Sequence, residues 1–183
     1  MRLVATALLT LVLVSGCADD HEHSGGAVTI SPTTTPTTPA GSPEALTVTD
    51  DTMAEIEEVQ RRALDFIKKS EGEDGVIIGF EPLLPDAGWE ADILVSDAIY
   101  EVKVIGGDVF ADEQEGITRG AEGAWDVEID INEAIRISVA EPGTQFGEIT
   151  FDGELWEVET YREGETASTY VYVDPHSGDL VAF

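Results

Sequence analysis

Cysteine and basic residues are both scarce in this chain, and each scarcity excludes a class of protein. Cys17 is the only cysteine among 183 residues, so no disulfide can form within the chain. There are nine lysines and arginines against 38 aspartates and glutamates, which gives a formal net charge of −29. A surface of this charge repels phosphate backbones and anionic headgroups, so nucleic acid is excluded as a partner. Two alternatives explain the acidity: solubility alone, or a saline habitat in which salt screens the carboxylates from one another.

Histidine is scarce too, which bears on catalysis. Outside the first fifty residues the only histidine is His176, and it lies in a predicted turn. Serine and cysteine nucleophiles need such a base within hydrogen-bond reach, and a turn histidine is more often simply exposed. The sequence has no glycine-rich phosphate loop between a strand and a helix, and no run with EF-hand spacing. We therefore predict that the protein is not an enzyme and has no catalytic residue, cofactor or metal.

The sequence also lacks a hydrophobic run long enough to span a bilayer. Leu3–Val14 is an apolar run of 12 residues, whereas a spanning helix needs about 20. With Arg2 before it, this run is typical of a secretory signal peptide, which we predict over residues 1–16. Val14-Ser15-Gly16-Cys17 follows and resembles a bacterial lipoprotein lipobox. The resemblance implies lipidation of Cys17, anchoring in the membrane through that residue, and localisation on the extracytoplasmic face of the bacterial cell membrane. The alternative is an ordinary signal peptide followed by an incidental cysteine.

Residues 17–50 show no periodic pattern and are predicted to be a disordered tether. Ser31–Pro39 is rich in threonine and proline, a composition that favours an extended chain and, in a secreted protein, O-glycosylation. His21 and His23 lie among carboxylates, which allows a weak hypothesis of divalent-metal binding. No second group of ligands supports that hypothesis, so we expect a solvated spacer that lifts the folded part off the membrane.

Residues 51–110 predict a helix followed by antiparallel strands. Apolar side chains recur at helical spacing from Ile56 to Ile67, after a capping box of Thr52 and Glu55, and Gly72 is the expected C-cap. Three strands and a stub, Val109-Phe110, are predicted beyond the helix; the strands are Gly75–Glu81, Trp89–Val95 and Ile99–Ile105.

The same order of signals returns near the C-terminus. Residues 111–126 are acidic and aperiodic and are predicted to be a connector, and residues 127–183 then repeat the helix and the strands. The second helix is capped by Asp130 and Glu133, and the strands after it are Gln145–Phe151, Trp156–Thr160 and Thr169–Val173. The predicted fold class is therefore α+β, with two tandem copies of a helix packed on a three- to four-stranded antiparallel sheet.

Each copy is too small to be stable alone, so we expect the two to pack together. The aromatic residues that we expect to be buried between them are Trp89, Trp125, Trp156 and Phe183.

The stretch Trp156–Phe183 ends in a motif that suggests a family. Asp174–Gly178 is a tight turn in which Pro175 presets φ and Gly178 accepts a positive φ. A strand ending in Val173-Asp174, this turn, and then an acid and an aliphatic pair resemble the C-terminal end of a PepSY domain. The match covers about residues 129–183, whereas the first copy lacks the turn. The resemblance implies a bacterial surface lipoprotein that binds or modulates a secreted or envelope protein such as a peptidase, with no inhibitory residue carried over.

Three tyrosines are our candidates for protein binding: Tyr161, Tyr170 and Tyr172. A sheet with a helix on one face leaves the other face free, and these residues lie on its predicted strands. The alternative is that they only pack against neighbouring strands. For the whole chain, the alternative is a passive envelope or structural lipoprotein, or an assembly factor without a peptidase partner. The sequence leaves the oligomeric state open.

Overall fold

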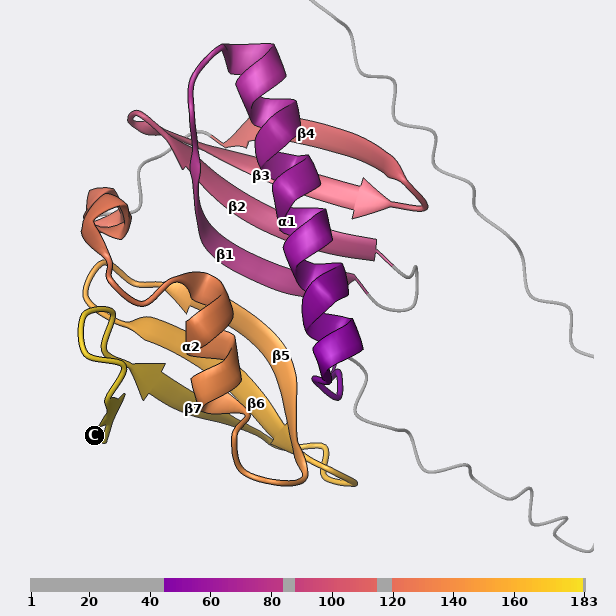
Figure 1. Ribbon diagram of the computed structural model, residues 1–183, viewed down its shortest axis with the longest axis vertical. Coiled ribbons are helices and arrows are strands. Elements are labelled where there is room, and N and C mark those ends of the chain that lie inside the picture. Colours follow the sequence, from indigo (N-terminus) through magenta and orange to yellow (C-terminus); the bar gives the residue numbers. More distant parts are fainter. Residues whose placement is uncertain (1–44, 84–87, 115–119, 183) are drawn as a thin grey trace, which may run out of the picture. The chain divides into compact units, whose positions relative to one another are not determined.

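The computed structural model describes residues 45–83, 88–114 and 120–182. They form an α+β fold in which helices pack on one antiparallel sheet of eight strands, which confirms the predicted class (Figure 1). The strand order is β4-β3-β2-β1-β5-β6-β7-β8. The strands are β1 (Val76–Leu83), β2 (Gly88–Val95), β3 (Ala98–Ile105), β4 (Asp108–Gln114), β5 (Thr144–Phe151), β6 (Trp156–Arg162), β7 (Ser168–Val173) and β8 (Leu180–Val181). The helices are α1 (Asp50–Glu71), the 3-10 helix η1 (Ala121–Asp126) and α2 (Ile131–Ser138).

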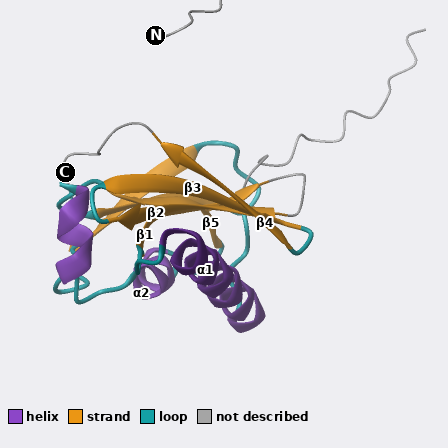
Figure 2. Cartoon of the chain, turned by 90° about the horizontal axis from the view of Figure 1, so that it is seen from above, coloured by secondary structure: helices purple, strands orange, loops and turns teal. Residues whose placement is uncertain are grey.

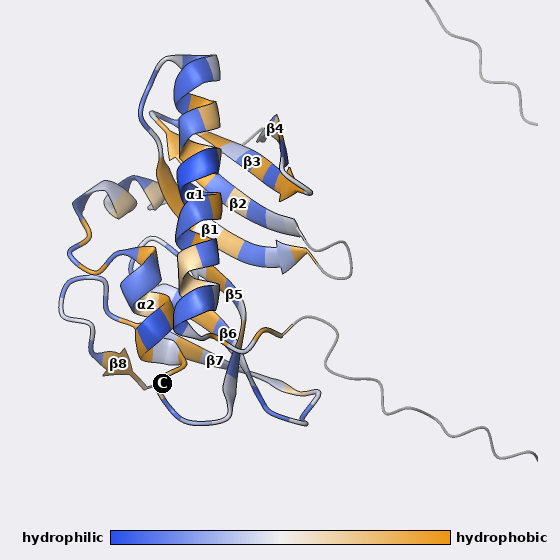
Figure 3. Ribbon diagram, turned by 45° about the vertical axis from the view of Figure 1, so that its right-hand side comes forward, coloured by the Kyte–Doolittle hydropathy of each residue, from blue (hydrophilic) through white to orange (hydrophobic). Residues whose placement is uncertain are grey.

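Helix α1 has 22 residues and packs on β1 to β4. Its N-cap is Thr49, whose hydroxyl accepts a hydrogen bond from the backbone N–H of Thr52 at 3.2 Å. The prediction of Thr52 as the cap was therefore wrong by three residues. The C-cap was predicted correctly, since Gly72 has φ +80° and its N–H donates to the carbonyl of Lys68. Figure 3 shows the residues that α1 presents outward in hydrophilic colours, as an amphipathic surface helix requires.

Helix α2 has only eight residues and packs on β5, β6 and β7. It begins as predicted at Asp130, whose carboxylate accepts a hydrogen bond from the N–H of Glu133 at 2.9 Å. Both helices lie on the same side of the sheet, and within the described residues no helix covers the other side (Figure 2). We call that uncovered side the open face.

The core lies between the helices and the sheet. Strand residues that point toward the helices are almost completely buried, among them Ala91, Ile93 and Val158. Two aromatic pairs add to it: Phe80 stacks on Trp89 with ring centroids 4.9 Å apart, and Phe151 meets Trp156 at 5.1 Å. Burial of this apolar surface is the main source of stability for the fold.

The two halves join through strands rather than through aromatic packing between separate sheets. β1 pairs with β5 at Gly79–Thr150 and Phe80–Ile149, so the strands of both halves form one continuous sheet. Trp89 and Trp156 are both buried, and Trp156 lines a cavity together with residues of α1 and β1. Trp125 is 46% exposed, which contradicts its predicted burial. Phe183 lies outside the described residues.

The acidic segment after Phe110 is more regular than predicted. β4 continues to Gln114 and pairs with β3 along its whole length, so the reading of Val109-Phe110 as a stub was wrong. Residues 121–126, also assigned to the connector, form η1. A strand at the edge of a sheet has only one partner, and its exposed acidic side chains conceal the alternation that marks a strand.

The C-terminal turn has the predicted geometry. Gly178 has φ +76°, and its N–H donates to the carbonyl of Asp174 at 2.9 Å. The Asp174 carboxylate accepts hydrogen bonds from the backbone N–H groups of His176 and Ser177, which hold the pKa of that carboxyl below its ordinary value. The turn brings β8 back to pair with the end of β7.

Candidate interaction surface

The open face of the sheet carries a concentration of carboxylates. Side chains alternate along a strand, so the residues between the buried positions Trp89, Ala91 and Ile93 of β2 point to the open face. The strand register then places their cross-strand neighbours on the same face. The carboxylates of the open face are Glu81, Glu90, Asp92, Glu101, Asp112, Glu148, Glu157 and Glu159.

Among these carboxylates, Asp92 of β2 has a raised pKa, and the strand register places it between Gly79 of β1 and Glu101 of β3. The pKa of Asp92 is raised from 3.8 to about 6, first by burial and then by the negative charges of Glu90, Glu101 and Glu148, while Lys103 opposes them. The side chain lies directly over Gly79, where a Cβ atom would be 3.0 Å from Asp92 Oδ2. Glycine at this bulge in β1 therefore makes room for the carboxylate.

Lys103 is the one basic residue of the open face within the described residues. Its ammonium lies 3.2 Å from Glu90 Oε2 and is also bonded to Glu101. These two bonds, with Glu101 the stronger, raise the pKa of Lys103. Because this ammonium is already paired with two carboxylates, the face as a whole stays strongly negative.

The three predicted tyrosines all lie on the open face. Tyr170 is directly opposite Glu159, and Tyr172 is opposite Glu157. Tyr170 is 50% exposed, and the charge of Glu159 is the first cause that raises the pKa of its phenol. The ring of Tyr161 covers the bulge in β5, since a Cβ atom on Gly147 would be 2.8 Å from it. The tyrosines thus border the carboxylates, and Tyr170 and Tyr172 lie opposite them across strands.

A shallow hollow of about 110 Å³ lies among these side chains, lined by Glu148, Thr150, Glu157, Glu159 and Tyr170. Phe110 adds an exposed aromatic ring at the other end of the face, opposite Lys103 on β3 and 56% exposed. Sequence reasoning missed Phe110 and the carboxylates of β2 and β3. The alternation of Glu90 and Asp92 with buried residues was the signal that could have found them.

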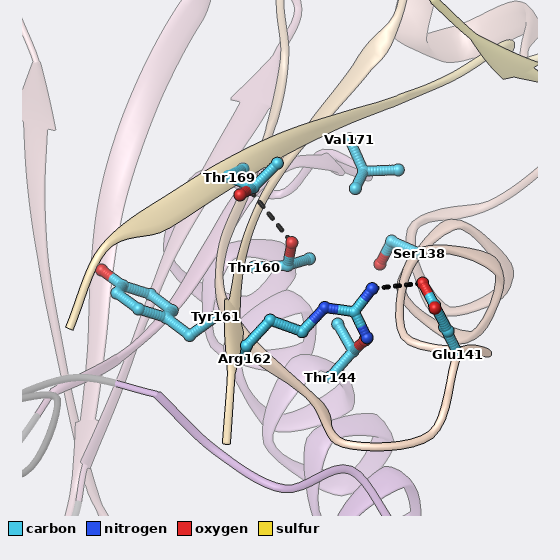
Figure 4. Close-up of a pocket in the computed structure, with 8 residues that line it drawn as sticks. All are labelled: Ser138, Glu141, Thr144, Thr160, Tyr161, Arg162, Thr169 and Val171. Atoms are coloured by element: carbon cyan, nitrogen blue, oxygen red, sulfur yellow. Dashed lines mark hydrogen bonds and ion pairs between the residues drawn. The ribbon is translucent and has the colours of Figure 1, made fainter. Parts of the chain in front are cut away.

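A second cavity, of about 260 Å³, lies on the helix side, beyond the end of α2 (Figure 4). Its polar side chains already have partners: Thr160 donates to the carbonyl of Thr169 at 3.0 Å, Ser138 donates to that of Ile135 at 2.8 Å, and Arg162 is paired with Glu141. The ring of Tyr161 points away from this cavity (Figure 4). The hydroxyls of Thr160 and Ser138 and the ion pair of Arg162 with Glu141 are thus already engaged within the chain.

The other residues that the sequence singled out lie elsewhere. Cys17, His21 and His23 are outside the described residues. His176 lies exposed in the C-terminal turn. In the described part of the chain no group of three histidine, cysteine or acidic residues is placed to bind a metal. Neither does any helix there have the length and hydrophobicity to cross a membrane.

Comparison with known proteins identifies no family. No family model matches the chain, so the resemblance to PepSY domains stays a prediction. No curated protein matches it either. Among solved structures, a presumed lipoprotein of Clostridium difficile 630 is similar at 15% identity and a TM-score of 0.42, over 64% of this chain and 86% of that one. A likeness at this level carries no inference about function.

Proposed function

We propose that this chain is a non-catalytic lipoprotein, anchored through Cys17 on the extracytoplasmic face of the membrane, that binds a positively charged protein on the open face of its sheet. One observation carries the proposal: a sheet face that no described helix covers presents carboxylates bordered by three tyrosines. The anchor rests on the lipobox-like sequence before Cys17.

The chemistry of the open face favours a protein over a small molecule. Ligand pockets are typically several hundred Å³ and mostly apolar, whereas the hollow beside Tyr170 has about 110 Å³ and three glutamates. Tyrosine is enriched at protein interfaces, where its ring buries area and its hydroxyl keeps a polar contact. A field of one sign also steers an oppositely charged partner and speeds its association.

The partner that fits is a secreted or envelope protein with a basic surface. The similarity to PepSY domains implies a peptidase, which this lipoprotein would bind or modulate at the membrane. A negative surface held close to the membrane also keeps itself away from anionic headgroups and so remains accessible.

Photo-crosslinking tests this proposal in cells. A photoreactive amino acid in place of Tyr170 should give a crosslink to one basic protein, and the same amino acid in place of Glu58, exposed on α1, should not. Changing Glu157 and Glu159 to glutamine should reduce the Tyr170 crosslink. Equal crosslinking at both positions, or none at Tyr170, would instead support a passive spacer.

We also propose that the two halves are copies of one module. Bulges interrupt β1 between Ile77 and Gly79 and β5 between Phe146 and Glu148. Phe80 follows the bulge in β1, and Ile149 follows the bulge in β5 at the same distance. These two residues pair with each other where the halves meet. A two-fold axis that relates the two halves would therefore pass through this residue pair. Other pairs correspond as well, namely Trp89–Val104 with Trp156–Val173 and Val104–Val109 with Val173–Leu180.

Exchanging the two residues at the centre tests the relation. Phe80→Ile and Ile149→Phe should each cost about 1–3 kcal/mol, because both side chains are fully buried and one change leaves a void while the other overpacks. The double variant should recover at least half of the summed loss, because the two environments correspond. Additive losses measured by urea unfolding would contradict the relation.

A further inference from the structure

A third cavity, separate from the open face, lies where the two halves meet on the helix side. It has a volume of about 220 Å³, several times the volume of a water molecule. Its walls come from α1, β1, α2, β6 and the segments before β1 and α2, and they are mostly apolar. The lining residues are Gln60, Leu64, Gly75, Val76, Ile77, Val127, Asp130, Ile131, Asn132 and Trp156.

Two buried polar atoms on this wall have no hydrogen-bond partner. They are Gln60 Nε2, a donor, and Asn132 Oδ1, an acceptor. Gln60 is only 4% exposed, so its amide is buried almost completely. Leaving such groups without partners costs about 1–3 kcal/mol each. An apolar hollow that retains an unpaired donor and an unpaired acceptor matches a ligand with both an aliphatic part and a peptide-like polar part.

The corresponding place in the other half is already filled by the chain itself. Three residues before the N-cap of α1, Leu46 exchanges both backbone hydrogen bonds with Phe146, at 2.7 and 2.8 Å. This antiparallel bridge lies next to the bulge in β5, where β1 no longer pairs with that strand.

The second half lacks this bridge. Val127 precedes the N-cap of α2 by the same three residues, and Ile77 precedes the bulge in β1 as Phe146 precedes the one in β5. Both line the cavity, but among the described residues no bridge joins them. Instead, the two residues after Val127 donate their N–H groups to the carbonyl of Pro175. Although η1 packs against β1, no described residue there makes with Ile77 the backbone bridge that Leu46 makes with Phe146.

We infer that this cavity binds an extended, uncharged peptide strand through one aliphatic residue. The strand residue would take beside Ile77 the place that Leu46 takes beside Phe146, with its side chain among Leu64, Ile131 and Trp156. Flanking peptide groups accept from Gln60 Nε2 and donate to Asn132 Oδ1 once these buried amides turn toward the cavity. This is strand addition at an unfilled position between sheet and helix. It uses the helix side of the molecule and is independent of the proposal for the open face.

The chain supplies its own probe. An acetylated and amidated peptide of residues 45–49, with the uncharged sequence ALTVT, should bind the isotope-labelled full-length chain in detergent. The indole N–H of Trp156, which donates to the carbonyl of Ile129 at 2.9 Å, and the amide of Ile77 should shift saturably in the nuclear magnetic resonance spectrum. A peptide with aspartate in place of leucine should leave both signals in place.

Two variants make the result specific. Leu64→Trp fills the cavity from its half-buried rim and should weaken binding at least tenfold. Gln60→Met has nearly the same shape without the amide; it should fold and weaken binding about three- to tenfold. Shifts confined to the surroundings of Leu46 and Phe146 would mean that the peptide only replaces the chain's own Leu46 segment beside Phe146, and would overturn the inference. Absence of shifts up to the solubility limit of the peptide, or undiminished binding to Leu64→Trp, would overturn it as well.

Discussion

Replacing Asp92 by asparagine should stabilise the protein, but only at pH values at which the Asp92 carboxylate is charged. In the folded state the pKa of Asp92 is raised from 3.8 to about 6, so the fold binds its proton more tightly than the unfolded chain does. Stability therefore falls as pH rises through this interval, and the destabilisation is complete above about pH 6. The two pKa values differ by an amount worth about 3 kcal/mol for a fully shielded group. Because this side chain is partly solvated and salt screens its neighbours, we expect about 1–2 kcal/mol.

Thermal unfolding followed by circular dichroism at two pH values measures this effect. At about pH 7.5, Asp92→Asn should raise the Tm by about 3–8 °C for a folded region of this size. At about pH 3.5 the difference from the parent chain should shrink toward zero, because Asp92 is then protonated in the fold. Asp112→Asn, an equal change of charge at an exposed position on β4, is the matched control and should leave the Tm nearly unchanged. Equal shifts for the two variants, or an Asp92→Asn effect that does not depend on pH, would refute the reasoning.

Three further outcomes can be tested. Gly178→Ala should destabilise the protein more than Gly164→Ala, as measured by urea unfolding. Both glycines have φ near +80°, so the backbone strain alone should cost about 1 kcal/mol, which is the full loss expected for Gly164→Ala because Gly164 has open space around it. A Cβ at Gly178 would in addition be 3.2 Å from Ile137, so equal losses for the two variants would contradict this packing. Raising NaCl from about 0.05 to about 0.5 M should raise the Tm, because salt screens the repulsion on the open face; a fall in Tm would mean that ion pairs outweigh that repulsion. Cys17→Ala should move the protein from the membrane fraction to the medium or leave it unprocessed, and normal cleavage with unchanged membrane retention would exclude the lipid anchor.

Local signals in the sequence predicted most of the elements. Caps such as Asp130 and Gly72 act within a few residues, and so they can be recognised without the fold. At the start of α1 the sequence offers two threonines three residues apart, Thr49 and Thr52, and either can cap a helix. The structure selects Thr49, and the hydroxyl of Thr52 instead donates to the carbonyl of Thr47.

The joining of the halves could not be predicted from local pattern. It depends on two residue pairs, Gly79–Thr150 and Phe80–Ile149, whose partners are about 70 residues apart in the chain. The same applies to the pKa of Asp92. Its shift arises because β1, β2, β3 and β5 bring Gly79 beneath the carboxylate and glutamates around it. The tyrosines of β7 were found because they belong to a strand with a clear pattern, but their proximity to Glu157 and Glu159 follows from the register.

The bridge between Leu46 and Phe146 also determines how the molecule carries mechanical load. If Cys17 is the anchor, any force on a bound partner reaches the membrane through the chain just before α1, and Leu46 is the first described residue there to be fastened by backbone hydrogen bonds. It is fastened to β5, in the half farther along the sequence, and the ion pair between Glu57 and Arg136 ties the same end of α1 to α2. Tension from a partner held on β5 to β7 therefore passes through the C-terminal half directly, without crossing the narrow pairing of β1 with β5. The two hydrogen bonds of Leu46 are the first that pulling would break.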